Sequence, residues 1–232
     1  AQVTADKYGF TREEMDAFAI ESVTRAQRAV SEGVFAGEIA PVTISSRRGE
    51  HTVSEDETPG TVSMDKIPKL RAAFAKDGTV TAATSSSISD GAAAVVLMSE
   101  AEAGARGVTP LARIVGHSAF AQDPAWFTTS PVYALKMLHD KIGWAPDDVD
   151  LYEINEAFAV VTMAAMKDVG LDHGKVNVNG GACALGHPIG ATGSRITVTL
   201  VHELCARGLK RGIATQCIGG GEATAVAVEI VE

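Results

Sequence analysis

The sequence has little that would tie it to an oxidising compartment, to nucleic acid or to a membrane. Its 232 residues include only three cysteines, all in the last quarter of the chain, which is too few for a disulfide framework. Aromatic residues make up 5%, and the formal charge is −9 without any block of lysine or arginine, which argues against a general grip on nucleic acid or an anionic membrane surface. No apolar run is long enough to cross a bilayer. We therefore expect a small, acidic, cytoplasmic enzyme.

The sequence does contain enough apolar residues for a substantial core, at 46%. The clearest element is a helix opened by a capping box of Thr11 and Glu14 and closed by Gly33, with apolar residues at helical spacing between them. Pro131 begins another helix, which ends near Gly143. Further helices are predicted over residues 66–76, 155–170 and 193–208.

Strands are predicted where short apolar runs stand between turn residues. The run over residues 92–98 is typical of a strand buried on both faces. Because helices separate most of the strands, we expect crossover connections and a covered, mostly parallel sheet with an antiparallel edge. The other predicted strands cover residues 111–115, 149–154, 175–179, 213–218 and 224–230, the last two as a hairpin, while 47–61 is an exposed excursion.

Two glycine-rich turns in the last third of the chain each embed one reactive side chain. One turn runs from Asn179 to Gly190 and encloses His187, and the other begins at Cys217 and contains three consecutive glycines. Glycine costs conformational entropy, so such clusters are typical of places where backbone amides must approach a substrate, a phosphate or an oxyanion. The sequence therefore indicates a binding or catalytic site around these turns.

Three side chains at such junctions are candidates for chemistry. Asn155 stands where a strand gives way to a helix, at the edge where open α/β sheets bind ligands; a plain helix cap is the alternative. His187 could present one ring nitrogen to a reacting oxygen, or could simply be a histidine with a satisfied hydrogen bond. Backbone amides and a nearby imidazole are expected to lower the pKa of the Cys217 thiol, unless Cys217 is only a small buried hydrophobe.

Two other readings of the turns are weaker. Cys183, His187 and Cys217 could bind zinc, but the glycines and Pro188 preclude a regular helix face, and no Cys-x-x-Cys pair is present. A phosphate loop would need a lysine after its glycines, and none follows. We therefore expect no metal.

Taken together, three segments resemble the C-terminal signatures of the thiolases. The likeness extends upstream through residues 77–82 and 90–100, so it covers nearly all of the chain. It implies an α/β protein with the layered α/β/α/β/α thiolase fold, and the Glu222-Ala223 ending is more similar to the acetyl-CoA acetyltransferase branch. The segments are Asn155-Glu156-Ala157-Phe158-Ala159, Gly180-Gly181 through Gly186-His187-Pro188-Ile189-Gly190, and Cys217-Ile218-Gly219-Gly220-Gly221.

The resemblance also implies a division of the chain. Residues 1–88 would be the remainder of a loop domain that contacts coenzyme A, 89–109 a terminal strand and helical turn of the N-terminal half, and 110–232 the C-terminal domain. The acyl-accepting cysteine of the family matches nothing here, so the sequence looks like the last three-fifths of a thiolase. We expect an N-terminal segment or subunit as partner, and a homo-oligomer or heterotetramer.

Site residues follow from the same resemblance. Cys217 would be the acid/base, His187 and a water held by Asn155 would stabilise the enolate oxygen, and the amide of Gly219 would stabilise the oxygen of the acyl-enzyme. Coenzyme A and acetyl-CoA would be substrates, with no covalently bound cofactor. The coenzyme A contacts would be Ser86, Ala82, Phe158 and Phe74.

Two alternatives to a thiolase remain at this point. The chain could be a non-catalytic subunit that binds coenzyme A or supports assembly and keeps the turns for structure. It could also be a ketoacyl-synthase relative, although that group uses two histidines and this chain offers Cys217 where one would stand.

Overall fold

The computed structural model describes residues 1–231, and a four-stranded sheet organises the C-terminal half of them. The strands lie in the order β3-β6-β5-β4. β4 and β5 run parallel, whereas β6 pairs antiparallel with both β3 and β5. The strands are β3 (Ala112–Ala121), β4 (Leu151–Ile154), β5 (Arg211–Cys217) and β6 (Glu222–Ile230).

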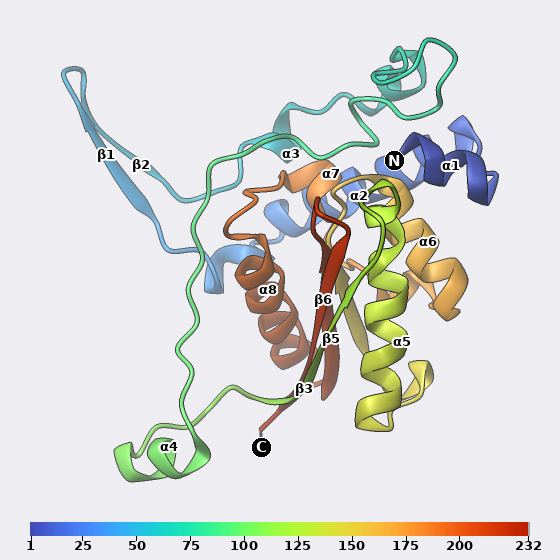
Figure 1. Ribbon diagram of the computed structural model, residues 1–232. Coiled ribbons are helices and arrows are strands. Elements are labelled where there is room, and N and C mark those ends of the chain that lie inside the picture. The colour runs from blue at the N-terminus through green and yellow to red at the C-terminus, as the bar shows by residue number, and fades with distance from the viewer. Residues whose placement is uncertain (232) are drawn as a thin grey trace.

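Helices cover both faces of this sheet (Figure 1). α5 (Ser130–Ile142) and α6 (Ala159–Val169) lie on one face, and α8 (Thr192–Arg207) lies on the other. Because side chains alternate along a strand, Ile213 of β5 packs beneath α5 while its neighbour Ala214 packs beneath α8. Two core clusters therefore hold the three layers together.

The N-terminal helices lie at the end of the sheet where β4 and β5 finish (Figure 1). α1 spans Gln2–Tyr8 and α2 spans Arg12–Ser31. The predicted capping box is confirmed, since Thr11 Oγ1 accepts from the Glu14 amide at 3.1 Å and Glu14 Oε2 accepts from the Thr11 amide at 2.8 Å. α2 packs against the short helix α7 (Ala182–Leu185), which lies inside the first glycine-rich turn.

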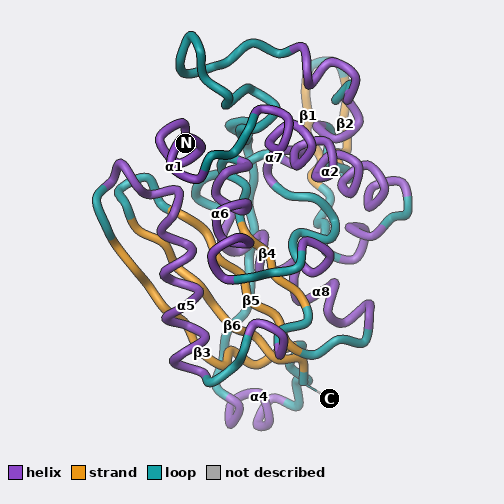
Figure 2. The backbone as a smooth tube through the Cα atoms, turned by 90° about the vertical axis from the view of Figure 1, so that its right-hand side faces the viewer, coloured by secondary structure: helices purple, strands orange, loops and turns teal. Residues whose placement is uncertain are grey.

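Two parts of the chain extend away from this body (Figures 1 and 2). One is an exposed hairpin of β1 (Val42–Ser46) and β2 (Gly49–Val53), followed by α3 (Thr58–Thr61). The other is a long extended segment that ends in α4 (Glu100–Arg106). Residues 92–98 lie in this segment, and the prediction of a doubly buried strand there is wrong, because Val96 is 84% exposed and the run pairs with no strand among residues 1–231.

Three further predictions need correction. The sheet is not mostly parallel, because the tight turn between β5 and β6 and the antiparallel β3 leave β4 and β5 as its one parallel pair in the described chain. Residues 175–179 form no strand: Val176 makes a single bridge to Tyr152, and Asn177 then takes a φ of 47°. The helix predicted over residues 66–76 is only a 3-10 turn, Met64–Lys69, containing Pro68.

Candidate active site

Two of the three predicted junctions meet at the carboxyl end of the parallel strands. The Asn155 amide donates to the Thr215 carbonyl at 3.0 Å, which continues the ladder between β4 and β5 past the last residue of β4. At this edge, Asn155 Nδ2 lies 3.4 Å from His187 Nε2. Asn155 is 1% exposed, and its Oδ1 is buried without a partner in the described part of the chain. The side chain therefore keeps an acceptor free beside the imidazole.

A hydrogen bond at Nδ1, on the other side of the ring, fixes the tautomer of His187. His187 Nδ1 lies 2.6 Å from Thr192 Oγ1, and that hydroxyl already donates to the Pro188 carbonyl at 3.0 Å. Thr192 Oγ1 must therefore accept from Nδ1–H, which leaves the lone pair of the neutral ring on Nε2. Burial and the nearby Arg195 lower the pKa of His187. The imidazole is thus neutral at pH 7, with a basic nitrogen facing Asn155.

Cys217 is the last residue of β5 and lies next to the same sheet edge. Its side chain is 6% exposed and packs with apolar neighbours, Ala157, Val161, Phe127 and Phe158. Burial raises the pKa of the Cys217 thiol to about 12, so the expectation of a lowered pKa is wrong. The cause is burial in the apolar pocket, which outweighs the hydrogen bond from the backbone amide of Cys217 itself. Within residues 1–231 no hydrogen bond joins this thiol to the His187 ring, and the group is a protonated thiol at neutral pH.

Gly219 lies at the tip of the second glycine-rich turn. The turn is closed by a bond from the Gly221 amide to the Ile218 carbonyl at 3.0 Å and by one from the Ile218 amide to the Glu222 carbonyl at 2.8 Å. The Gly219 amide makes no such bond to any described residue, and no heavy atom lies within 4 Å of where a Cβ would be. It is an available donor beside Cys217.

The residues expected to contact coenzyme A lie near the start of α6. Both the amide and the hydroxyl of Ser86 donate to the Ala157 carbonyl, each at 3.1 Å. The Phe158 ring meets Phe74 edge-on at 5.8 Å between centroids. Ala82 is exposed in the loop that leads to Ser86. This loop also reaches the first glycine-rich turn, because the His187 amide donates to the Ser87 carbonyl at 3.0 Å.

Two residues of this region escaped the sequence analysis. Thr192 orients His187 from the first turn of α8, and Glu156, next to Asn155, is 1% exposed. A carboxylate inside an otherwise apolar strand-to-helix junction was the available signal for Glu156.

Within residues 1–231, no three histidine, cysteine, aspartate or glutamate side chains gather as a metal site would need, and no helix has the length and apolarity to span a membrane.

The first glycine-rich turn has no room for a side chain at Gly181 but has room at Gly190. A Cβ on Gly181 would lie 2.3–2.6 Å from the carboxylate atoms of Glu156, whereas one on Gly190 would meet nothing within 4 Å. We predict that Gly181→Ala lowers the free energy of unfolding by about 3 kcal/mol through overpacking, and that Gly190→Ala changes it by less than about 0.5 kcal/mol. Urea denaturation of both variants measures this difference, and equal stabilities would contradict the close packing.

Comparisons with known proteins show which family the chain belongs to. The chain is 50% identical to an acetyl-CoA acetyltransferase of Thiocystis violacea, over 99% of this chain and 59% of that protein. It superposes on the crystal structure of the Bacillus anthracis acetyl-CoA acetyltransferase with a TM-score of 0.97 and 46% identity, covering 99% of this chain and 59% of that one. For human mitochondrial 3-ketoacyl-CoA thiolase the TM-score is 0.91 and the identity 38%, with 99% and 58% covered. Residues 1–101 match the thiolase N-terminal domain and residues 108–230 the thiolase C-terminal domain, and the chain therefore belongs to the thiolase family.

Proposed function

We propose that the chain carries the C-terminal part of a thiolase site that transfers an acyl group between coenzyme A and acetyl-CoA. The reaction would be Claisen condensation of two thioesters, or in reverse the thiolysis of a 3-ketoacyl-CoA. The observation that carries the proposal is the pairing of Asn155 Nδ2 with His187 Nε2 at 3.4 Å, at the sheet edge where Cys217 ends the neighbouring strand. The acetyl-CoA acetyltransferases similar to this chain support the substrate class.

His187 would serve both half-reactions. Its basic Nε2 can take the proton of an attacking thiol, and the imidazolium formed can then donate a hydrogen bond to oxygen. Loss of a proton from the α-carbon of acetyl-CoA leaves charge on the thioester oxygen, which needs preorganised donors. His187 and a water bound to the unpartnered Oδ1 of Asn155 would supply them.

Cys217 would move the α-proton. During thiolysis its protonated thiol gives a proton to the departing enolate carbon, and during condensation the thiolate removes that proton. The enolate carbon then bonds to the carbonyl carbon of an acyl-cysteine, and the cysteine sulfur leaves as thiolate. The amide of Gly219 would donate to the oxygen of that acyl group.

The acyl-accepting cysteine would come from outside the described residues. The chain spans 59% of the length of two acetyl-CoA acetyltransferases to which it is similar. Cys205 is exposed on α8, and the Cys183 thiol faces the Glu156 carbonyl at 3.8 Å, so neither is placed to take an acyl group at this edge. The exposed apolar side chains of Ile88 and Val96, at 93% and 84%, support a partner segment or subunit that covers residues 88–98.

We further propose that residues 1–88 are the remainder of a loop domain whose last part contacts coenzyme A at the mouth of the site, with residues 89–109 completing an N-terminal half and 110–232 forming the C-terminal domain. Ser86 and Phe158 would line the path of the pantetheine arm, since they border the Ala157 carbonyl beside the Cys217 pocket. Phe74, which is 62% exposed, would stack on the nucleotide, and Ala82 would line the same loop.

Acetyl transfer to protein tests this function. The chain, assembled with the N-terminal part of an acetyl-CoA acetyltransferase, is incubated with acetyl-CoA and digested, and mass spectrometry locates the acetyl group. We expect it on a cysteine outside residues 1–232, with none on Cys183, Cys205 or Cys217. Stable acetylation of Cys217, or no acetylation in an assembly that has formed, would contradict the proposed roles.

A further inference from the structure

The Glu156 carboxylate joins three segments that build the candidate site. It follows Asn155 directly and accepts hydrogen bonds from Ser22 Oγ of α2 at 2.7 Å, from Asn177 Nδ2 at 2.8 Å and from the Cys183 amide at 3.1 Å. Ser22 and Cys183 both bond to Oε2, and Asn177 bonds to Oε1. One buried side chain therefore links the end of β4, helix α2 and the turn that leads to His187.

The direction of each of these bonds is fixed by its surroundings. Asn177 Oδ1 accepts from the Ile154 amide and its Nδ2 donates to the Ile154 carbonyl, both at 2.8 Å, so this amide has one orientation. The Cys183 amide is always a donor. Ser22 Oγ accepts from the Gly181 amide at 3.0 Å, which leaves its hydroxyl proton for Glu156. All three neighbours donate to Glu156, so a carboxyl proton would find no acceptor among them, and the arrangement suits an ionised carboxylate.

Burial and these donors act against one another on the carboxyl. Burial raises the pKa of Glu156 above its ordinary value, and the hydrogen bonds from Asn177, Ser22 and the Cys183 amide offset only part of that rise. A buried charge that gives up hydration is retained only where such donors replace the water. The donors come from three separate segments of the chain, so the buried carboxylate holds these segments together.

The glycine-rich turn is fitted to this carboxylate. A Cβ on Gly181 would overlap the carboxylate atoms of Glu156, and one on Gly180 would lie 2.5 Å from the Ser22 carbonyl. Gly180 also has a φ of 80°, a conformation that favours glycine. The two glycines let the turn approach α2 and β4 together, and the chain reaches His187 six residues after Gly181.

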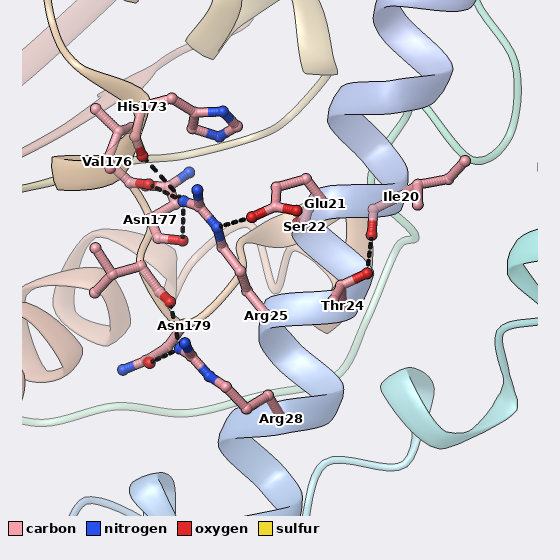
Figure 3. A network of polar contacts seen from close by, with 12 residues as sticks. Ile20, Glu21, Ser22, Thr24, Arg25, Arg28, His173, Val176, Asn177 and Asn179 are labelled. Carbon is pink, nitrogen blue, oxygen red and sulfur yellow. Dashed lines mark hydrogen bonds and ion pairs between the residues drawn. The ribbon is translucent and has the colours of Figure 1, made fainter.

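Two arginine side chains next to Ser22 bind helix α2 to residues 173–179 (Figure 3). Arg25 Nη1 donates to the Val176 carbonyl at 2.7 Å and to the His173 carbonyl at 3.1 Å, and Arg28 Nη2 donates to the Val178 carbonyl at 2.7 Å. The carbonyls bound by Arg25 and Arg28 lie on either side of Asn177, so these contacts also position Asn177. Two of the three donors to Glu156 are therefore positioned by contacts of their own.

We propose that ionised Glu156 is a positioning residue that fixes the separation and orientation of Asn155 and His187. This inference rests on the proposed function, since it assigns Glu156 to the same site without contact to substrate. Glu156 holds the backbone on both sides of the pair, at the end of β4 and in the turn before His187. The hydrogen bond between Thr192 Oγ1 and His187 Nδ1 then fixes the orientation of the His187 ring.

The substitution Glu156→Gln tests this role, because glutamine has nearly the same shape as glutamate but replaces one acceptor oxygen with an NH2 donor. An amide NH2 at either oxygen position would face an obligatory donor, so at least one segment must shift. Asp16→Asn is the matched control, because Asp16 is another buried carboxylate, on α2, which is bound by Arg12 at 2.7 Å and makes no described hydrogen bond to Asn155, His187 or Cys217. In the assembled enzyme we expect Glu156→Gln to lower kcat about 10²-fold with little change in KM, and Asp16→Asn to leave both near their original values.

NMR of the ring nitrogens of His187 in the ¹⁵N-labelled chain supplies a readout independent of turnover. We expect the Nδ1–H tautomer in the original protein and in Asp16→Asn, and a changed tautomer ratio and titration in Glu156→Gln. Should Glu156→Gln fail to fold, Ser22→Ala removes one donor, and the same changes are expected to be smaller. Unchanged His187 signals in the folded variants would overturn the positioning role. Full activity of His187 variants would instead overturn the proposed function.

Discussion

Replacing His187 with alanine is expected to lower acyl transfer by roughly 10³-fold or more, because one side chain serves as base and as oxyanion donor. The ring lies between Thr192 Oγ1 at 2.6 Å and Asn155 Nδ2 at 3.4 Å. Neither the hydroxyl of Thr192 nor the amide of Asn155 is a base, so neither can replace the imidazole in proton transfer. The measurement is the thiolysis rate of acetoacetyl-CoA by the assembled enzyme. Since burial and Arg195 lower the pKa of His187, the rate should fall only as the pH drops below the ordinary histidine value, about 6.5.

A second histidine provides the control for this variant. His51 is exposed on the β2 hairpin, far from the sheet edge in the fold, and His51→Ala is expected to leave the rate unchanged. Circular dichroism and the elution volume of both variants verify that the assembly is intact. Comparable thiolysis rates for the His187 and His51 variants would contradict a catalytic role of the His187 imidazole.

Cys217→Ser is expected to separate the two half-reactions. A serine fills nearly the same volume in the pocket of Ala157, Val161 and Phe158, but its hydroxyl is a far poorer proton carrier than a thiol. Condensation and the exchange of acetyl-CoA α-protons with deuterium should fall by roughly 10³-fold or more. Acetylation of the partner's cysteine should continue at close to its original rate.

Proton NMR in deuterium oxide follows the exchange, and stopped acetylation reactions followed by mass spectrometry measure the other half-reaction. Cys205→Ser, on the exposed face of α8, is the control and should affect neither. Equal losses in both half-reactions of the Cys217 variant would argue that the thiol supports structure rather than proton transfer.

Local signals in the sequence predicted the elements that depend on local contacts. The capping box of Thr11 and Glu14 opens α2, and the glycines after Cys217 join β5 to β6, as expected. Predictions that depended on distant partners fared worse. Apolar residues 92–98 look like a buried strand, but no strand in the described chain pairs with them, and the apolar run alone carries no information about its neighbours.

The candidate site shows the same division. Position in the turns was enough to nominate Asn155 and His187, which the fold brings to 3.4 Å. The protonation of Cys217 depends on Phe127 and Val161, which come from other elements, so its direction was predicted wrongly. A carboxylate at this junction was a signal for Glu156, but its role could not be predicted because its hydrogen-bond partner Ser22 lies 134 residues away along the chain.

The central claim is that Asn155, His187 and Cys217 surround one thioester. A crystal structure of the assembled enzyme with acetyl-CoA tests it most directly. We expect the thioester oxygen next to the His187 ring and within hydrogen-bond distance of a water bound to Asn155, with the methyl carbon in contact with the Cys217 sulfur. A thioester bound elsewhere, or packed protein between the Cys217 sulfur and the His187 ring, would contradict the account.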